Sequence, residues 1–116
     1  MSHYVIYHNP RCSKSRNTLA LLQERGVEPD VVLYLEASPD AEEIRSLLQK
    51  LDLSAAQLVR RGEDAYKAAG LNSNSSEEEL IAAMACHPKL IERPIVVSGA
   101  RAVLGRPPEN VLELLD

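Results

Sequence analysis

Short hydrophobic runs and one segment of helical spacing organise the N-terminal part of the chain. Tyr4–Tyr7 is a β-favouring run, and the continuous apolar run Val31–Leu35 predicts a second strand buried on both faces. The residues between them predict a helix that begins near Cys12 and runs to Arg25, where Gly26 is a stop signal. A strand, a helix and a strand within about 35 residues form a βαβ unit, which normally makes the two strands parallel.

Helices are predicted through the middle of the chain. Ser38 with Pro39 is a natural N-cap and first helical position for the first of them. Ser76 with Glu79 forms a capping box for the last. The other predicted features are an apolar helix face of Ile44, Leu47, Leu48 and Leu51, two short helices over 54–59 and 63–69, and a helix end at Pro88.

The C-terminal part returns to β-favouring runs. Residues 94–97 and 102–104 flank Ser98-Gly99 and predict a hairpin. Pro107-Pro108 then restarts a helix, and its apolar residues are Val111, Leu112 and Leu115. The order βα, β, helical middle, ββα predicts an α/β fold: one domain over residues 1–116, with a mixed sheet and helices on its faces.

The composition narrows the possible partners. The 116 residues are 45% hydrophobic and 26% charged, without Phe or Trp, and the net charge is −4. An acidic chain without aromatic platforms argues against nucleic-acid binding. However, no acid precedes Glu24, while Arg11, Lys14 and Arg16 lie close together. This cluster indicates either a site for a small anion or an ordinary solvated charge cluster.

Cysteine usage and the absence of long apolar runs indicate a cytoplasmic protein with reduced thiols. Two cysteines are too few for a disulfide framework. The first residues do not resemble a secretory signal, and no apolar run approaches the ~18 residues of a membrane helix. The cysteines and the three histidines show no close metal-ligand spacing, and no nucleotide-binding loop is present. We therefore expect no metal and no bound cofactor.

Cys12 is the candidate nucleophile because it lies where a strand leads into a helix N-terminus. The unpaired N–H groups and the dipole at such a terminus favour an anion, and the thiolate is the reactive form of cysteine. Lowering the pKa from about 8.5 by two units takes roughly 2.7 kcal/mol. A helix end supplies ~0.3–1 kcal/mol, and up to ~2 kcal/mol when partly buried. Nearby cations must supply the rest, and the candidates are His8, Arg11, Lys14 and Arg16.

The polar, basic surroundings of Cys12 favour a reactive thiol over an inert buried one. Cys86 instead follows several alanines on a predicted helix, so we expect it to pack in the core. Ser15 stands where a Cys-x-x-Cys motif would have its resolving thiol. An outside thiol such as glutathione, or less readily Cys86, must therefore release any adduct of Cys12. Thr18 excludes the Cys-x5-Arg loop of tyrosine-phosphatase-like enzymes.

Six stretches, spread in order over nearly the whole chain, carry a resemblance to a known family. They are Ile6–Pro10 with Cys12, Ser15–Leu19, Leu33–Glu36, Leu58–Arg60, Leu90–Val97 and Arg106-Pro107. In these stretches the sequence resembles the glutaredoxin-coupled arsenate reductases. The resemblance implies a thioredoxin-like fold, with a helical insertion at roughly 38–88. The basic Arg11 and Lys14 replace the small neutral residues expected at these places in the best-known reductases.

The resemblance also implies the site. Cys12 attacks arsenate, glutathione adds to the arsenic adduct, and glutaredoxin completes the reduction to arsenite. The Arg93–Pro94 bond is expected to be cis, presenting backbone opposite Cys12, and His8 is expected to favour the thiolate. Guanidinium groups suit a planar-faced oxyanion. The candidate substrate-binding residues are Arg60 (or its neighbour Arg61), Arg93, Arg106, Ser15 and Arg16.

Two other functions remain open from the sequence. A thiol enzyme of the same fold could act on another oxyanion or on a glutathionylated protein. A redox-regulatory binding protein that contacts RNA polymerase is the third alternative, but such proteins switch through a Cys-x-x-Cys pair, and Ser15 removes the second thiol.

Overall fold

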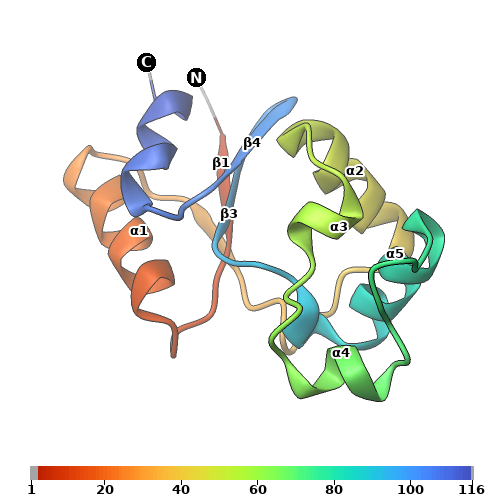
Figure 1. Cartoon of the computed structure of the whole chain (residues 1–116). Helices are drawn as coiled ribbons and strands as arrows, with labels where there is room; N and C mark the ends of the chain where they lie inside the picture. Colours follow the sequence, from red (N-terminus) through yellow and green to blue (C-terminus); the bar gives the residue numbers. More distant parts are fainter. Residues whose placement is uncertain (1–2, 116) are drawn as a thin grey trace. The chain divides into compact units, whose positions relative to one another are not determined.

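The computed structural model describes residues 3–115, which group into two compact units (Figure 1). One unit combines the residues up to Ala37 with those from Arg93 onward, and the other is Ser38–Glu92. The second unit overlaps the residues, roughly 38–88, that the resemblance assigned to a helical insertion, and the assignment of one domain with such an insertion stays a prediction.

The first unit is built on a four-stranded mixed sheet in the order β2-β1-β3-β4. The parallel neighbours β1 and β2 are connected through α1, and β1 and β3 are antiparallel, as are β3 and β4. The predicted βαβ unit and C-terminal hairpin are therefore confirmed. The bounds are β1 (Tyr4–Tyr7), α1 (Ser13–Glu24), β2 (Asp30–Val32), β3 (Ile95–Ser98), β4 (Arg101–Leu104) and the 3-10 helix η2 (Pro108–Leu114).

The core of this unit lies between one face of the sheet, α1 and η2. Ile6 and Val96 are register partners on β1 and β3, so their side chains lie on the same face, where they contact Leu22 of α1. Val111 and Leu114 of η2 complete the cluster. A 3-10 helix has three residues per turn, so its buried positions recur every third residue. The helix predicted after Pro107-Pro108 is therefore a 3-10 helix, in which Leu112 and Leu115 are only partly buried.

The strand predicted over Val31–Leu35 is the main error in the fold. β2 is only three residues long, lies at the sheet edge, and leaves the Val31 side chain 46% exposed. An edge strand has one neighbour, so burial on both faces does not follow from its hydrophobicity. Residues 34–36 form a turn, and within it Tyr34 is the residue that is buried.

The second unit consists of helices. Asp40, not Ser38, is the N-cap of the first of them, and its carboxylate accepts the Glu43 N–H at 2.8 Å. The capping box of Ser76 and Glu79 is confirmed. The elements are α2 (Ala41–Leu51), α3 (Ala55–Leu58), α4 (Asp64–Ala68), α5 (Glu77–Cys86) and the 3-10 helix η1 (Pro88–Leu90).

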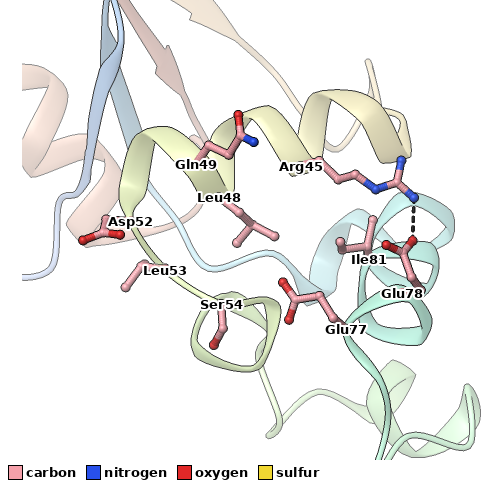
Figure 2. Close-up of a pocket in the computed structure, with 9 residues that line it drawn as sticks. All are labelled: Arg45, Leu48, Gln49, Asp52, Leu53, Ser54, Glu77, Glu78 and Ile81. Atoms are coloured by element: carbon pink, nitrogen blue, oxygen red, sulfur yellow. Dashed lines mark hydrogen bonds and ion pairs between the residues drawn. The ribbon is translucent and has the colours of Figure 1, made fainter.

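Helices α2 and α5 form the centre of this unit (Figure 2). Their buried faces carry Ile44, Leu47 and Leu48 on α2, with Leu80, Ile81 and Met84 on α5. At the surface Arg45 pairs with Glu78 across the two helices. Glu77 accepts the Ala55 N–H at 3.1 Å and so satisfies a donor at the start of α3.

Candidate functional site

Cys12 is the N-cap residue of α1, as the sequence predicted. Its backbone is extended (φ −95°, ψ 122°), its side chain is partly exposed, and its N–H donates to the Asn9 carbonyl at 3.0 Å. The Asn9 side chain accepts the Arg11 N–H at 3.0 Å, which fixes the turn between β1 and α1. The thiol therefore stands at the positive end of a helix, on a turn held by the residues before it.

The environment of Cys12 favours the thiolate. Burial raises the pKa of its thiol, but hydrogen bonds from the Ser15 N–H, the Arg93 guanidinium and the Lys14 N–H, together with the charge of Arg93, lower it further than burial raises it. The resulting pKa lies below the ordinary cysteine value. Only the thiolate is a good nucleophile, so this residue is activated at its position.

The cation that stabilises the thiolate comes from a distant part of the chain. Arg93 lies two residues before β3, whereas the sequence pointed to basic residues beside Cys12. Of those neighbours, Arg16 donates to the Pro10 carbonyl at 2.9 Å, and Lys14 acts on the thiol through its backbone N–H. Arg11 is exposed. The charge on this thiolate thus depends on tertiary folding as well as on the helix terminus.

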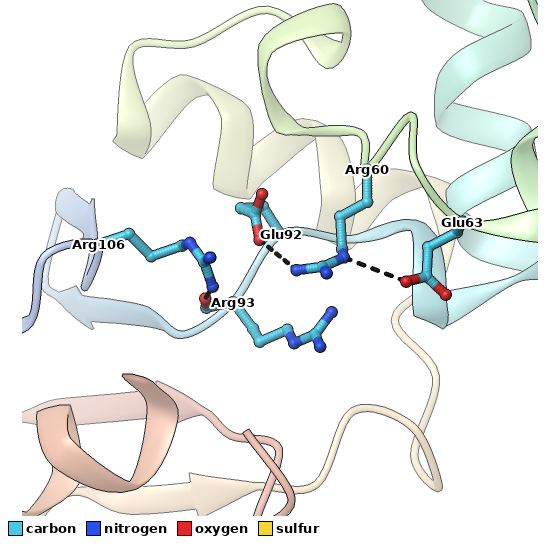
Figure 3. Close-up of polar contacts among 5 residues, drawn as sticks. All are labelled: Arg60, Glu63, Glu92, Arg93 and Arg106. Atoms are coloured by element: carbon cyan, nitrogen blue, oxygen red, sulfur yellow. Dashed lines mark hydrogen bonds and ion pairs between the residues drawn. The ribbon is translucent and has the colours of Figure 1, made fainter. Parts of the chain in front are cut away.

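The loop that carries Arg93 is held by Arg106. Its Nη1 donates to the Arg93 carbonyl at 3.2 Å (Figure 3). The Arg93–Pro94 bond is cis, as the resemblance implied, and the bond after Arg106 is also cis, which was not expected. Arg106 is therefore seen here as a residue that positions the Arg93 loop.

Gly105 provides the close approach between this loop and α1. A Cβ at this position would lie 2.5 Å from Thr18 Oγ1 and 2.8 Å from Pro94 Cγ. Thr18 is fully buried, and its hydroxyl donates to the Lys14 carbonyl at 2.7 Å. The Gly105 N–H donates to the Pro94 carbonyl at 2.9 Å. The sequence did not predict this contact between Gly105 and Thr18, because only the folded chain brings the two residues together.

We expect Gly105→Ala to lower the free energy of unfolding by about 1–3 kcal/mol, since the added methyl group overlaps a buried side chain and a proline ring. Urea denaturation measures this directly. Gly62→Ala is the matched control, because its Cβ would meet nothing within 4 Å and its φ lies outside the left-handed region. Equal stability of the two variants would contradict the close approach.

Ser15 and His8, which lie on either side of Cys12 in the sequence, form a buried polar pair. Ser15 is fully buried, its Oγ accepts the Asn9 N–H at 3.0 Å, and it lies 2.7 Å from His8 Nδ1. Burial, followed by the charge of Arg16, lowers the pKa of His8. A neutral imidazole is therefore expected near pH 7, with its Nδ1 accepting the Ser15 hydroxyl.

This arrangement changes two roles that the sequence suggested. A neutral His8 adds no positive charge to the thiolate, and the buried Ser15 side chain has no surface to offer a substrate. In this geometry both residues position the turn that carries Cys12. A direct part for either in the reaction stays a prediction of the resemblance.

The buried pair predicts an acid sensitivity. The pKa of His8 is lowered on folding, so the unfolded chain binds the proton more readily, and stability falls as the pH drops through the ordinary histidine range near 6.5. We expect His8→Asn, which keeps an acceptor for Ser15 but does not titrate, to reduce the loss of unfolding free energy between pH 7 and pH 5. Denaturant titrations at both pH values measure it. An undiminished loss would contradict the lowered pKa.

Arg60 lies in the second unit, and its charge is opposed by two carboxylates (Figure 3). Nη1 is 2.6 Å from Glu92 Oε1, and Nε is 3.6 Å from Glu63 Oε2. The Arg60 N–H also donates to the Leu90 carbonyl at 2.7 Å. Of these contacts, only the ion pair with Glu63, three residues after Arg60, involves a close neighbour in the sequence. Binding of an oxyanion by Arg60, or by the exposed Arg61, stays a prediction.

Cys86 does not pack in the core as expected. It is the last residue of α5, and it is exposed. Within residues 3–115, no group of three or more His, Cys, Asp or Glu side chains could hold a metal ion. The same part of the chain contains no helix that is long and apolar enough to cross a membrane.

Cys12 is partly exposed at a helix N-terminus, and its sulfur accepts a hydrogen bond from Arg93, the residue before a cis-proline. These features, on this mixed sheet, define a thioredoxin-like thiol protein. The chain belongs to the ArsC family, whose family model matches residues 7–114. It is 60% identical over 112 residues to uncharacterized protein YfgD of Escherichia coli (strain K12), covering 95% of this chain and 94% of that protein.

Two further relatives carry a functional name. The arsenate reductase of Haemophilus influenzae is 47% identical over 113 residues, which are 96% of this chain and 97% of that protein. The solved structure of an arsenate reductase from Vibrio cholerae is 54% identical, with a TM-score of 0.94 and 98% of each chain covered. The resemblance to arsenate reductases and the thioredoxin-like fold are confirmed.

Proposed function

We propose that this chain is an arsenate reductase in which Cys12 attacks arsenic, and glutathione with glutaredoxin supplies the electrons. The observation that carries the proposal is the contact of the Cys12 sulfur with the Arg93 guanidinium and with two N–H groups of α1. The relatives named arsenate reductase support the same substrate.

The donors around Cys12 suit an oxyanion on the sulfur as well as the thiolate itself. Backbone N–H groups at a helix start and a planar guanidinium can hold the oxygens of an arsenate group bound to Cys12. The resemblance adds Arg60 and Arg106 as expected ligands, and Arg16 is a further candidate. Phosphate has the same shape and charge, so discrimination comes from the chemistry: thiols reduce arsenic(V) and not phosphorus(V).

The proposed reaction balances as arsenate plus two thiols giving arsenite, a disulfide and water. The Cys12 thiolate forms a bond to arsenic(V), and one arsenate oxygen leaves as water after protonation. Glutathione then replaces a second oxygen, which also leaves as water, so that both sulfurs are bound to arsenic(V). A glutaredoxin thiolate attacks the glutathione sulfur: a glutaredoxin–glutathione disulfide forms, and the electron pair of the broken sulfur–arsenic bond stays on arsenic, which becomes arsenic(III). Water replaces Cys12 on arsenic, and arsenite and the Cys12 thiolate are released.

A coupled assay tests the proposal. The chain, arsenate, glutathione, glutaredoxin, glutathione reductase and NADPH are mixed, and both NADPH oxidation and arsenite are measured. We expect arsenate-dependent oxidation that equals the arsenite formed, and none when phosphate replaces arsenate. A parallel assay with thioredoxin and its reductase identifies the reductant.

The outcomes separate the candidate functions. Turnover with thioredoxin alone would overturn the glutathione and glutaredoxin part of the proposal. An absence of turnover with either reductant, from a chain whose Cys12 still alkylates at low pH, would overturn arsenate reduction. That result would favour a thiol enzyme that acts on another oxyanion or on a glutathionylated protein.

A further inference from the structure

A cavity of about 290 Å³ opens beside the turn that leads into Cys12. It lies within the first unit, and one of its lining residues, Arg11, is the residue before Cys12 in the sequence. Its volume is near the lower end of the ~300–1,000 Å³ range of small-molecule sites. The lining residues are His8, Asn9, Pro10 and Arg11 on the turn, with Leu33, Leu35 and Glu36 after β2.

The apolar part of the cavity is exposed. The side chains of Leu33 and Leu35 are 37% and 39% accessible, and with Val31 they are the exposed large hydrophobic residues of the described chain. They are exposed because β2 ends at Val32, and the chain then turns along the sheet edge. Apolar side chains that lie together at the surface and line a cavity are candidates for a ligand-binding surface.

The polar part of the cavity carries two opposite charges. Arg11 and Glu36 are both exposed, and within residues 3–115 neither forms an ion pair. A simple oxyanion would be repelled by Glu36, and a purely apolar ligand would leave both charges unused. A zwitterion with an apolar middle matches the whole lining. The sequence placed Arg11 in a cluster that could bind a small anion, but Arg11 is not among the groups that stabilise the Cys12 thiolate in the structure.

We propose that this cavity binds a zwitterionic thiol tripeptide, namely glutathione, with Arg11 pairing one carboxylate and Glu36 the amino group. Leu33 and Leu35 contact its methylene groups, and its thiol is directed at the neighbouring Cys12. The inference rests on the proposed function, in which a second thiol must come from outside. The position of a local resolving thiol is occupied by Ser15, which is fully buried.

Binding is tested with S-methylglutathione, which cannot form a disulfide. Calorimetric titration of the full chain should give a measurable Kd, and Arg11→Gln and Glu36→Gln should each raise it about tenfold, the loss expected for one charge-assisted hydrogen bond. Arg25→Gln and Glu28→Gln make the same charge changes at exposed residues outside the cavity and should change Kd less than twofold.

A second measurement uses Cys12 without arsenate. Its thiolate attacks oxidised glutathione, so a Cys12–glutathione disulfide forms and one glutathione thiolate leaves. We expect Arg11→Gln to slow this exchange about tenfold, while exchange with the neutral bis(2-hydroxyethyl) disulfide changes less than twofold.

The results distinguish this inference from the proposed function. Binding that weakens in both cavity variants supports the tripeptide site even if arsenate is not turned over. Arsenate turnover together with unchanged binding in both variants overturns the site but not the reductase. Absence of measurable S-methylglutathione binding also overturns the site, and it would leave the leucines as a contact surface for a protein partner.

Discussion

Cys12→Ser is expected to reduce arsenate-dependent turnover by at least about 10⁴-fold, to the level of the assay without protein. The substitution replaces sulfur by oxygen at nearly the same position, so the helix start and the hydrogen bonds around it remain available. A serine hydroxyl stays protonated near neutral pH and is too weak a nucleophile to form the bond to arsenic with which the proposed reaction begins. The coupled NADPH assay, with arsenite measured separately, gives the ratio of the two rates.

Cys86→Ser is the matched control for this experiment. Cys86 is the other cysteine of the chain, it is exposed, and it lies in the second unit at the end of α5. We expect its turnover to stay within twofold of the unchanged protein. A large loss in Cys86→Ser would mean that Cys86 supplies the second thiol, and the outside reductant would then act one step later.

Local patterns predicted the elements of this fold better than they predicted burial. The strand at Tyr4–Tyr7, the capping box at Ser76 and the C-terminal hairpin depend on neighbouring residues, and all three are present. Burial of Val31–Leu35 depends on which strand lies at the sheet edge, and hydrophobicity alone does not contain that information. The Cys86 error has a similar origin, since the side chain at a helix end can face solvent even among apolar neighbours.

Those parts of the candidate site that depend on neighbouring residues in the sequence could be predicted. Cys12 at a helix start can be read from a strand, a turn and a helical pattern in sequence. The partner of its thiolate could not be chosen among many arginines by physical reasoning alone, because Arg93 reaches Cys12 only through the pairing of β3 with β1. The family resemblance did indicate Arg93, because it rests on matching stretches from nearly the whole chain. Neither approach indicated that Ser15 is needed to hold His8 and Asn9.

Arg93→Met is expected to lower arsenate-dependent turnover by about 10²–10³-fold, the loss typical of one preorganised electrostatic donor. Methionine retains much of the length of the side chain but removes the charge and the hydrogen bond to the Cys12 sulfur. The pKa of Cys12 should therefore rise, and the pH dependence of iodoacetamide alkylation measures that rise independently of arsenate. Arg93→Lys should recover part of both effects, since it restores charge without the planar fork.

The same substitution makes a prediction about stability whose sign follows from the lowered pKa of Cys12. The folded chain releases the thiol proton more readily than the unfolded chain, so the stabilisation is complete above the ordinary thiol pKa of about 8.5 and is lost as the pH falls through the folded value. Arg93→Met should thus lower the unfolding free energy more at pH 9 than at pH 5, because the stabilisation linked to the thiolate decreases as the thiol takes up its proton. Arg101→Met, an exposed arginine on β4, should show no such difference. A loss for Arg93→Met that is the same at both pH values would mean that Arg93 acts on the fold and not on the thiolate.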